Sequence, residues 1–293
     1  MRLLVTGASG QLGSYLLRAL NQRDHCVTAW SGSRSDNLFG HRLRPVDLAE
    51  NDALVAAYRE ARPEITIHAA AISTVAACYR DAERAGLVNV TGTELLAELA
   101  AESQTRLIFV STDLVFDGED APYSEQASPS PLSVYGKTKV AAERLVLDVR
   151  RSVVARGSLL FGVAINGRST FFDEQVAALR HGTKSTAFVN EWRAPLSVQA
   201  AAEGLLALAE SDFDGLLHLG GPERISRFEM GQRLAAWLGS DSSAVVPGRR
   251  GDVKSAEPRP CDVTLDSSLW RARFPDAPWP TFEEALTEFD FGL

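Results

Sequence analysis

The segment PLSVYGKTKVAAERL, residues 131–145, contains a tyrosine and a lysine at a spacing that supports proton transfer. Tyr135 and Lys139 form a Y-x-x-x-K pattern, and residues four apart share one face of a helix. A phenol titrates near ~10, but a nearby ammonium group and a cofactor cation draw its pKa toward the working pH. Such a tyrosine can exchange a proton with a carbinol or carbonyl oxygen while a hydride moves to or from a cofactor. Without a companion motif, the same pattern describes a helix start with a solvated lysine.

A companion motif follows the apolar run at 107–111, where the sequence reads STDLVFDG. Ser111, Thr112 and Asp113 close this predicted strand, and strand ends at the carboxyl edge of an α/β sheet border the ligand crevice. A hydroxyl, a phenol and an ammonium group would then meet beside a nicotinamide. We therefore predict Thr112, Tyr135 and Lys139 as catalytic residues, with Thr112 orienting the reacting oxygen.

The glycines of TGASGQLG predict a dinucleotide site at the start of the chain. Gly7, Gly10 and Gly13 stand between a predicted strand at 2–6 and a predicted helix at 12–20. Glycines allow a tight turn and let a pyrophosphate approach the amides of a helix N-terminus, where the helix dipole favours an anion. The strand–loop–helix context favours this interpretation over a merely structural turn.

The end of the second predicted strand, TAWSGSRSD, bears on the choice of cofactor. An acid at this place usually holds the ribose 2′-hydroxyl of NAD, but here Ser31, Ser33 and Arg34 occupy the region. A hydroxyl and a forked guanidinium suit a 2′-phosphate. We predict NADP(H) as the preferred cofactor, with NAD(H) as the alternative because Asp36 follows closely.

Further strand ends supply small and acidic residues for the same cofactor. Asp47 could accept a hydrogen bond from the adenine amino group, with Leu48 beside the ring; a helix N-terminal charge is the other interpretation. Small side chains at Ala69, Ala70 and Ala71 would let a cofactor lie close to the backbone. His68, which precedes them, is interpreted as structural.

The elements that must position these residues alternate between short apolar runs and amphipathic stretches. Strands are predicted at 2–6, 25–30, 44–46, 65–69, 107–111 and 153–156, and helices at 12–20, 53–59, 87–101, 135–149, 171–181, 198–210 and 228–238. This alternation predicts a parallel sheet covered on both faces. We expect an α/β protein: a doubly wound Rossmann domain at 1–160 and a smaller α/β substrate lobe at 161–293, with some late segments returning to the sheet.

The composition of the chain disfavours several classes of binding partner and site. The chain has 293 residues and a formal net charge of −8, which disfavours general binding to nucleic acid or anionic membranes. Three widely spaced cysteines suggest neither a disulfide framework nor a metal site, and no segment is apolar enough to span a membrane. Without a signal-peptide pattern at the N-terminus, we expect a cytoplasmic protein.

In order along the chain, the motifs TGASGQLG, HAAA, STDLVFDG, PYSEQASPSPLSVYGKTK and ARGSLLFG resemble the extended short-chain dehydrogenase/reductase superfamily. Within it they are most similar to the dTDP-4-dehydrorhamnose reductase branch. The resemblance is strong over residues 1–165 and weaker beyond. It implies an NADP(H)-dependent reductase of a nucleotide-linked 4-keto-6-deoxy sugar.

By position, the resemblance assigns catalysis to Thr112, Tyr135 and Lys139, and a substrate contact to Asp113. It adds Gln11 and Leu12 to the cofactor site, which also takes Gly10, Asp47, Leu48, Ala69, Ala70 and Ala71. Asn89 matches a common helix asparagine or forms an internal hydrogen bond. We also expect Arg193 and Arg259 to bind the diphosphate of the substrate, since guanidinium matches phosphate oxygens.

Two departures from the branch leave the sugar open: Leu159 replaces a tryptophan that faces the sugar in the rhamnose reductases, and the stretch 195–199 lacks the acid often found before its following helix. Leu114 argues against a dehydratase, because that reaction needs an acid directly after the Thr-Asp pair. A sugar-nucleotide epimerase uses the same three catalytic residues. The regulatory subunit of methionine adenosyltransferase resembles the same branch and binds NADP without turnover. A homodimer is left open.

Overall fold

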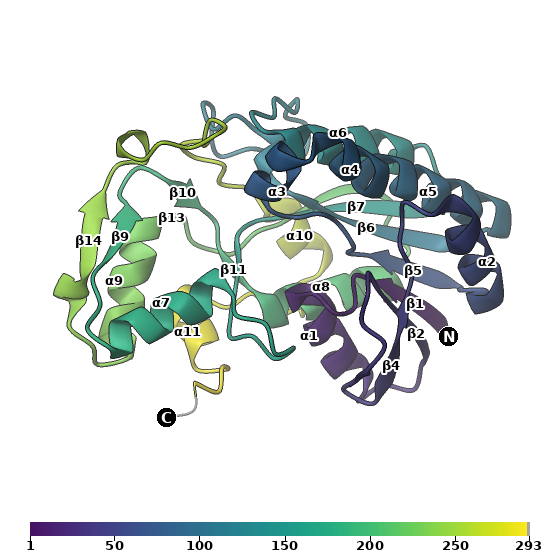
Figure 1. The fold of residues 1–293 in the computed structure, drawn as a ribbon, viewed down its shortest axis with the longest axis horizontal. Coiled ribbons are helices and arrows are strands. Elements are labelled where there is room, and N and C mark those ends of the chain that lie inside the picture. Colours follow the sequence, from purple (N-terminus) through teal and green to yellow (C-terminus); the bar gives the residue numbers. More distant parts are fainter. Residues whose placement is uncertain (292–293) are drawn as a thin grey trace.

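The computed structural model describes residues 1–291 and contains one large, mainly parallel sheet (Figure 1). The strand order is β12-β7-β6-β5-β1-β2-β4-β3, and only the β3–β4 pair is antiparallel. The strands are β1 Arg2–Thr6, β2 Cys26–Ser31, β3 Asn37–Leu38, β4 His41–Pro45, β5 Ile65–His68, β6 Arg106–Thr112, β7 Ser152–Gly157 and β12 Gly215–Leu219. Apolar runs such as Leu3–Val5 are buried on both faces, as expected of central parallel strands.

Helices cover both faces of this sheet, which confirms the predicted α/β class. Helices α1 (Gln11–Leu20) and α8 (Val198–Glu210) lie together on one face, below the sheet in Figure 1. Helices α2 (Asn51–Ala61), α5 (Gly92–Ser103) and α6 (Val134–Leu147) lie on the other. Because α8 and β12 come from the second half of the chain, that half contributes to the large sheet and to its cover.

The remaining elements of the second half form short sheets and helices beside the carboxyl edge of the large sheet. β9 pairs with β14, β10 with β13, and β11 with β8. Their bounds are β8 Leu160–Phe161, α7 Phe171–Arg180, β9 Ser185–Phe188, β10 Trp192–Arg193, β11 Leu196–Ser197, β13 Ile225–Ser226, α9 Arg227–Trp237, β14 Val245–Gly248, α10 Ser268–Arg273 and α11 Phe282–Leu286.

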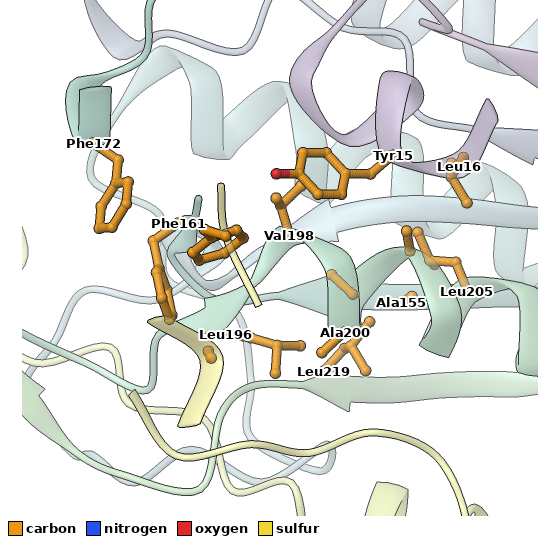
Figure 2. Close-up of a cluster of buried hydrophobic side chains, with 14 of the residues drawn as sticks. Tyr15, Leu16, Ala155, Phe161, Phe172, Leu196, Val198, Ala200, Leu205 and Leu219 are labelled. Atoms are coloured by element: carbon orange, nitrogen blue, oxygen red, sulfur yellow. The ribbon is translucent and has the colours of Figure 1, made fainter. Parts of the chain in front are cut away.

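A continuous hydrophobic core joins the large sheet to these later elements. Figure 2 shows Tyr15 and Leu16 of α1, Leu205 of α8, and then Phe161 and Phe172 further along, and all five are at most 2% exposed. Phe161 packs against Phe172 with ring centroids 5.7 Å apart. The two halves of the chain therefore bury apolar surface against each other.

The prediction of a helix at 87–101 is wrong for its first residues, where the structure has a π-helical turn in place of an α-helix. Two short helices, α3 (Val75–Arg80) and α4 (Ala82–Gly86), precede a π-helical turn over Leu87–Thr91, and α5 begins only at Gly92. Within that turn, the Asn89 amide accepts from the Ile72 N–H at 2.8 Å and donates to the Thr138 hydroxyl at 3.1 Å. The wider turn places this side chain between two other segments, so Asn89 forms internal hydrogen bonds.

The sequence analysis also did not predict the two-residue strands, because segments this short carry no apolar periodicity. β3, which precedes β4 in a hairpin, is one example, and β4 begins at His41 rather than at 44. Within residues 1–291, no helix combines the length and apolarity needed to cross a membrane.

Candidate active site

A cleft of about 1100 Å³ follows the carboxyl ends of the parallel strands and is closed on its far side by residues from the second half. The predicted site residues that line it are Gly7, Gly10, Gln11, Leu12, Gly13, Ser31, Asp47, Leu48, Ala69, Ala70, Ala71, Thr112, Asp113, Tyr135, Lys139, Arg193 and Arg259. Arg34 does not line it. The topology therefore brings nearly all of the predicted residues to one crevice.

The glycine loop between β1 and α1 can form only with glycine at two of its positions. Gly7 has φ +68°, and a Cβ there would lie 2.7 Å from the Ala70 nitrogen. A Cβ on Gly13 would lie 2.2 Å from the Gly7 carbonyl oxygen. α1 begins at Gln11 without a side-chain cap, which leaves its first N–H groups without a side-chain partner, and residues 11–13 line the cleft. This loop fits the pyrophosphate of a dinucleotide.

The loop after β2 contains no carboxylate free to bind a ribose. The Ser31 hydroxyl donates to the Arg34 carbonyl at 2.5 Å. The Arg34 guanidinium holds Asp36 with two hydrogen bonds, of 2.9 and 2.5 Å, and donates to the Asn166 carbonyl at 2.9 Å. Arg34 and Asp36 therefore neutralise each other beside the cleft.

At the end of β4, Asp47 is paired with an arginine that sequence reasoning missed. Arg84 of α4 donates from Nη2 to Asp47 Oδ2 at 2.5 Å, and Asp47 Oδ1 accepts from the Ala49 N–H at 3.0 Å. Leu48 and Val88 line the cleft beside them. No sequence pattern connects Asp47 with Arg84, which are 37 positions apart.

Helix α6 presents Tyr135 and Lys139 to the end of β6. Its N-cap Ser133 accepts a hydrogen bond from the Gly136 N–H at 3.1 Å. A Cβ on Gly136 would lie 2.3 Å from the Leu114 carbonyl oxygen, so glycine allows the helix to approach the segment after Thr112 closely. The Thr112 hydroxyl donates to Asp113 at 3.2 Å. Thr112, Tyr135 and Lys139 thus line one part of the cleft.

The protein's own groups shift both ionisable members of this trio toward their neutral forms. Burial raises the pKa of Tyr135, the Asp113 carboxylate raises it further, and a hydrogen bond with Thr112 opposes them. Burial lowers the pKa of Lys139 to about 7, against the opposing effect of Glu143. The Lys139 ammonium lies 3.9 Å from the centroid of the Phe109 ring. The expected lowering of the phenol pKa is therefore not produced by the chain alone.

A buried ion pair connects α6, the helix of Tyr135 and Lys139, to β7. Arg156 of β7 binds Glu143 of α6 through Nε at 2.9 Å and Nη2 at 2.7 Å. Ser111 donates to the same carboxylate at 2.5 Å. Ser111, which sequence reasoning placed beside Thr112, therefore has a structural partner. His68 is also structural: it lies between the hydroxyls of Thr6 and Thr93, and burial lowers its pKa to about 3.

Arginines gather around Glu191 on the far side of the cleft. Arg193, which is buried, lies 3.4 Å from Glu191 and 3.7 Å from Asp113, and the partly exposed Arg259 donates to Glu191 at 3.0 Å. Arg227, at the first position of α9, also lines the cleft, and burial lowers its pKa to about 10. Sequence reasoning missed Arg227, because an arginine at a helix start carries no specific signal. Three guanidinium groups thus face two carboxylates.

Together, the doubly wound sheet, the glycine loop at a helix N-terminus and the Y-x-x-x-K helix define a dinucleotide-binding protein of the extended short-chain dehydrogenase/reductase class. The chain belongs to the family described as RmlD substrate binding domain, whose model matches residues 1–290. The resemblance to the dTDP-4-dehydrorhamnose reductase branch is confirmed.

Two relatives with assigned names differ in role. Methionine adenosyltransferase 2 subunit beta of Xenopus tropicalis is 33% identical over 279 residues, which cover 91% of this chain and 80% of that protein. A probable low-salt glycan biosynthesis reductase of Haloferax volcanii is 28% identical over 294 residues, covering 99% of this chain and 97% of that protein.

Solved structures share the fold. A dTDP-4-dehydrorhamnose reductase from Bacillus anthracis, in complex with NADP, superposes with a TM-score of 0.86 at 22% identity and covers 98% of each chain. The Bordetella bronchiseptica enzyme WbmG, in complex with NAD, has a TM-score of 0.82 at 21% identity and covers 98% of this chain and 92% of its own. Structural neighbours thus bind NADP or NAD.

Proposed function

We propose that this protein is an NADP(H)-dependent reductase of a nucleotide-linked 4-keto-6-deoxy sugar. The observation that carries the proposal is the position of Thr112, Tyr135 and Lys139 in the same cleft as the glycine loop. A bound nicotinamide would supply the hydride. The fold alone would also suit other chemistry, so the proposal depends on these side chains.

Tyr135 is the proton donor in this proposal. Its raised pKa keeps the phenol protonated at neutral pH, which is the form required to protonate an oxygen that receives a hydride on its carbon. The Thr112 hydroxyl binds the same oxygen and orients it. Lys139, one helical turn from Tyr135, would bind the nicotinamide ribose and stabilise the phenolate that remains.

The preference for NADP(H) is supported by the loop after β2. A carboxylate that could bind a ribose 2′-hydroxyl is absent from Ser31–Gly32–Ser33, and Asp36 is held by Arg34. A 2′-phosphate would offer Arg34 a second anion at the same place. Cleft-lining Arg168 lies two residues beyond Asn166, to which Arg34 donates, and adds positive charge near this end.

The diphosphate of the substrate is assigned to the arginine cluster. Arg193, Arg227 and Arg259 line the cleft on the side opposite the glycine loop, and their charge exceeds that of Glu191 and Asp113. Burial alone would raise the pKa of Glu191, but Arg193 and Arg259 hold it below its ordinary value, so it remains ionised. The three guanidinium groups outnumber the two carboxylates by one positive charge, which favours an anionic group such as a diphosphate at this place.

A second candidate function is a regulatory subunit that binds NADP without turnover. It is favoured by the 33% identity to methionine adenosyltransferase 2 subunit beta, which is named as a subunit. The presence of all three catalytic side chains in the cleft supports the reductase instead.

The two functions can be separated with purified protein, NADPH and a panel of nucleotide-linked 4-keto sugars. A fall in nicotinamide absorbance that requires one of the sugars supports the reductase. Tight NADPH binding with no turnover on any sugar, together with a stoichiometric partner that co-purifies, supports the regulatory subunit and contradicts our proposal.

A further inference from the structure

A loop of the second half of the chain, residues 253–260, forms part of one wall of the cleft. Both of its ends are held at Asn190, because the Arg250 N–H donates to the Asn190 side chain at 3.0 Å and the Cys261 thiol donates to the Asn190 carbonyl at 3.3 Å. After β14 the chain runs over toward α3 (Figure 1), and residues 255–260 line the cleft. The loop therefore extends from the short strands of the second half toward the helices of the first half.

One side chain of this loop is buried although its neighbours are exposed. In the run 253–259, Glu257 alone is buried, with 8% of its surface exposed. Its Oε1 accepts a hydrogen bond from the Val134 N–H at 2.7 Å, whereas its buried Oε2 has no hydrogen-bond partner within residues 1–291. Burying a carboxyl oxygen without a partner costs stability. Residues that break such a rule are expected at functional sites.

The contact of Glu257 lies at the first turn of α6, next to the proposed proton donor. Other N–H groups of this turn have local partners: the Gly136 N–H donates to the Ser133 hydroxyl at 3.1 Å, and the Lys137 N–H donates to the Ser133 carbonyl at 2.9 Å. Val134, the first residue of α6, is instead bound by Glu257, which is 123 positions further along the chain. A carboxyl group at a helix N-terminus is favourable, because the N–H groups there have no partners within the helix.

We propose that Glu257 is a positioning residue for the reaction. By holding the N–H of Val134, it fixes the first turn of α6, and Tyr135, the next residue, then keeps its place relative to Thr112 and the reacting oxygen. This inference rests on the proposed reductase function and adds a residue to it. A displacement of about 1 Å at a reacting group can lower a rate about 100-fold, so a single hydrogen bond to this turn is sufficient to matter.

The same loop connects the helix of Tyr135 with the place assigned to the diphosphate. Arg259, two residues after Glu257, donates to Glu191 of the arginine cluster at 3.0 Å. Glu257 and Arg259 thus bind opposite sides of the cleft, the first at α6 and the second at the arginine cluster. In this arrangement the second half of the chain both binds the substrate and holds the helix that protonates it.

The kinetic test compares Glu257→Ala and Glu257→Gln with the parent protein in sugar-dependent NADPH oxidation. We expect Glu257→Ala to lower kcat about tenfold to a hundredfold, while KM for the sugar and the dissociation constant for NADPH change by less than about threefold. Glu257→Gln keeps an oxygen that accepts from the Val134 N–H. Its kcat should therefore lie within about threefold of the parent value.

A second measurement needs neither substrate nor turnover. Amide hydrogen exchange over residues 133–138, followed by mass spectrometry, reports how often the first turn of α6 opens. Exchange should be faster in Glu257→Ala than in the parent protein, and Glu257→Gln should match the parent. Lys254→Ala is the matched control, because Lys254 is exposed in the same loop and does not line the cleft. It should leave kcat, KM and exchange unchanged.

Three results would overturn the inference and leave the proposed function standing. The first is a Glu257→Ala protein with parent kcat, including one in which only KM for the sugar rises, because Glu257 would then serve binding alone. The second is unchanged exchange over residues 133–138. The third is an equal loss of kcat in Glu257→Gln, because the hydrogen bond to Val134 would then not be the cause. A parent protein with no turnover on any sugar would overturn the proposed function and this inference together.

Discussion

Lys139 lies in an environment that opposes its charge. In an unfolded chain its ammonium group would titrate near ~10.4, whereas burial lowers the pKa to about 7 in the folded protein. Between these values the unfolded chain binds more protons than the folded one. The free energy of unfolding therefore rises with pH across this window and is lowest below pH 7.

Lys139→Met should make the protein more stable at pH 6 while abolishing turnover. The gain should be on the order of a few kcal/mol, because each pKa unit corresponds to about 1.4 kcal/mol, and it should shrink as the pH approaches 10. Denaturant unfolding at a series of pH values measures it. Lys137→Met, at an exposed position of the same helix, is the control and should show no such trend. A less stable Lys139→Met protein at pH 6 would contradict this account.

Arg34 and Asp36 test the cofactor preference. Arg34→Ala should weaken NADPH binding about tenfold to a hundredfold and NADH binding far less, because it removes one charged hydrogen bond to the 2′-phosphate. Asp36→Asn should strengthen NADPH binding by releasing the guanidinium from its partner. Titration of both cofactors with each variant gives the result. Small and equal effects on NADPH and NADH would refute the assignment.

The sequence was sufficient to predict which residues at strand ends lie in the cleft, because all strands of a parallel sheet have their carboxyl ends at the same edge. Thr112, Asp47 and Ala70 were placed in the cleft in this way. The partners of these residues were not predictable. Arg84 reaches Asp47 from α4, 37 positions further along the chain, and the pairing of Arg34 depends on the shape of its loop.

At the scale of elements, the position of α6 depends on a close approach between its backbone at Gly136 and the backbone at Leu114. Gly136→Ala would place a Cβ 2.3 Å from the Leu114 carbonyl oxygen, so the helix must move away from the end of β6. We expect a loss of about 1 to 3 kcal/mol in the free energy of unfolding, and a larger proportional loss of turnover than of NADPH affinity.

Gly86→Ala provides the matched comparison, because Gly86 is helical and a Cβ there would meet no atom within 4 Å. That variant should be stabilised by about 0.5 to 1 kcal/mol. Thermal unfolding and steady-state rates for both variants give the answer. Parent-like turnover in Gly136→Ala would show that the position of α6 does not limit catalysis.

Long elements such as α8 were predictable at their observed bounds, since a 13-residue run rich in alanine and leucine is typical of a helix. The π-helical turn at Leu87–Thr91 was not predictable, because the residues that Asn89 bonds within it, Ile72 and Thr138, are distant in sequence and outside any local pattern. The two-residue strands of the second half are likewise defined by tertiary pairing rather than by sequence period.

At the scale of the whole molecule, the continuous core through Phe161 and Phe172 makes the two halves interdependent. We expect a single cooperative thermal transition by calorimetry, although the chain has 293 residues. NADPH at about 100 times its dissociation constant should raise the unfolding free energy by about 2.7 kcal/mol, and the whole transition should shift by several degrees. Two separated transitions, with only one shifted by NADPH, would show that the halves unfold independently.

The measurement that tests the central claim most directly is the rate of sugar-dependent NADPH oxidation by the parent protein and by Tyr135→Phe. The substitution removes one oxygen, so the fold and NADPH affinity should persist. If Tyr135 is the proton donor, turnover should fall about 10²- to 10⁴-fold with an unchanged dissociation constant for NADPH. A Tyr135→Phe protein that retains a rate within about twofold of the parent would contradict the assignment of this cleft as the active site of a reductase.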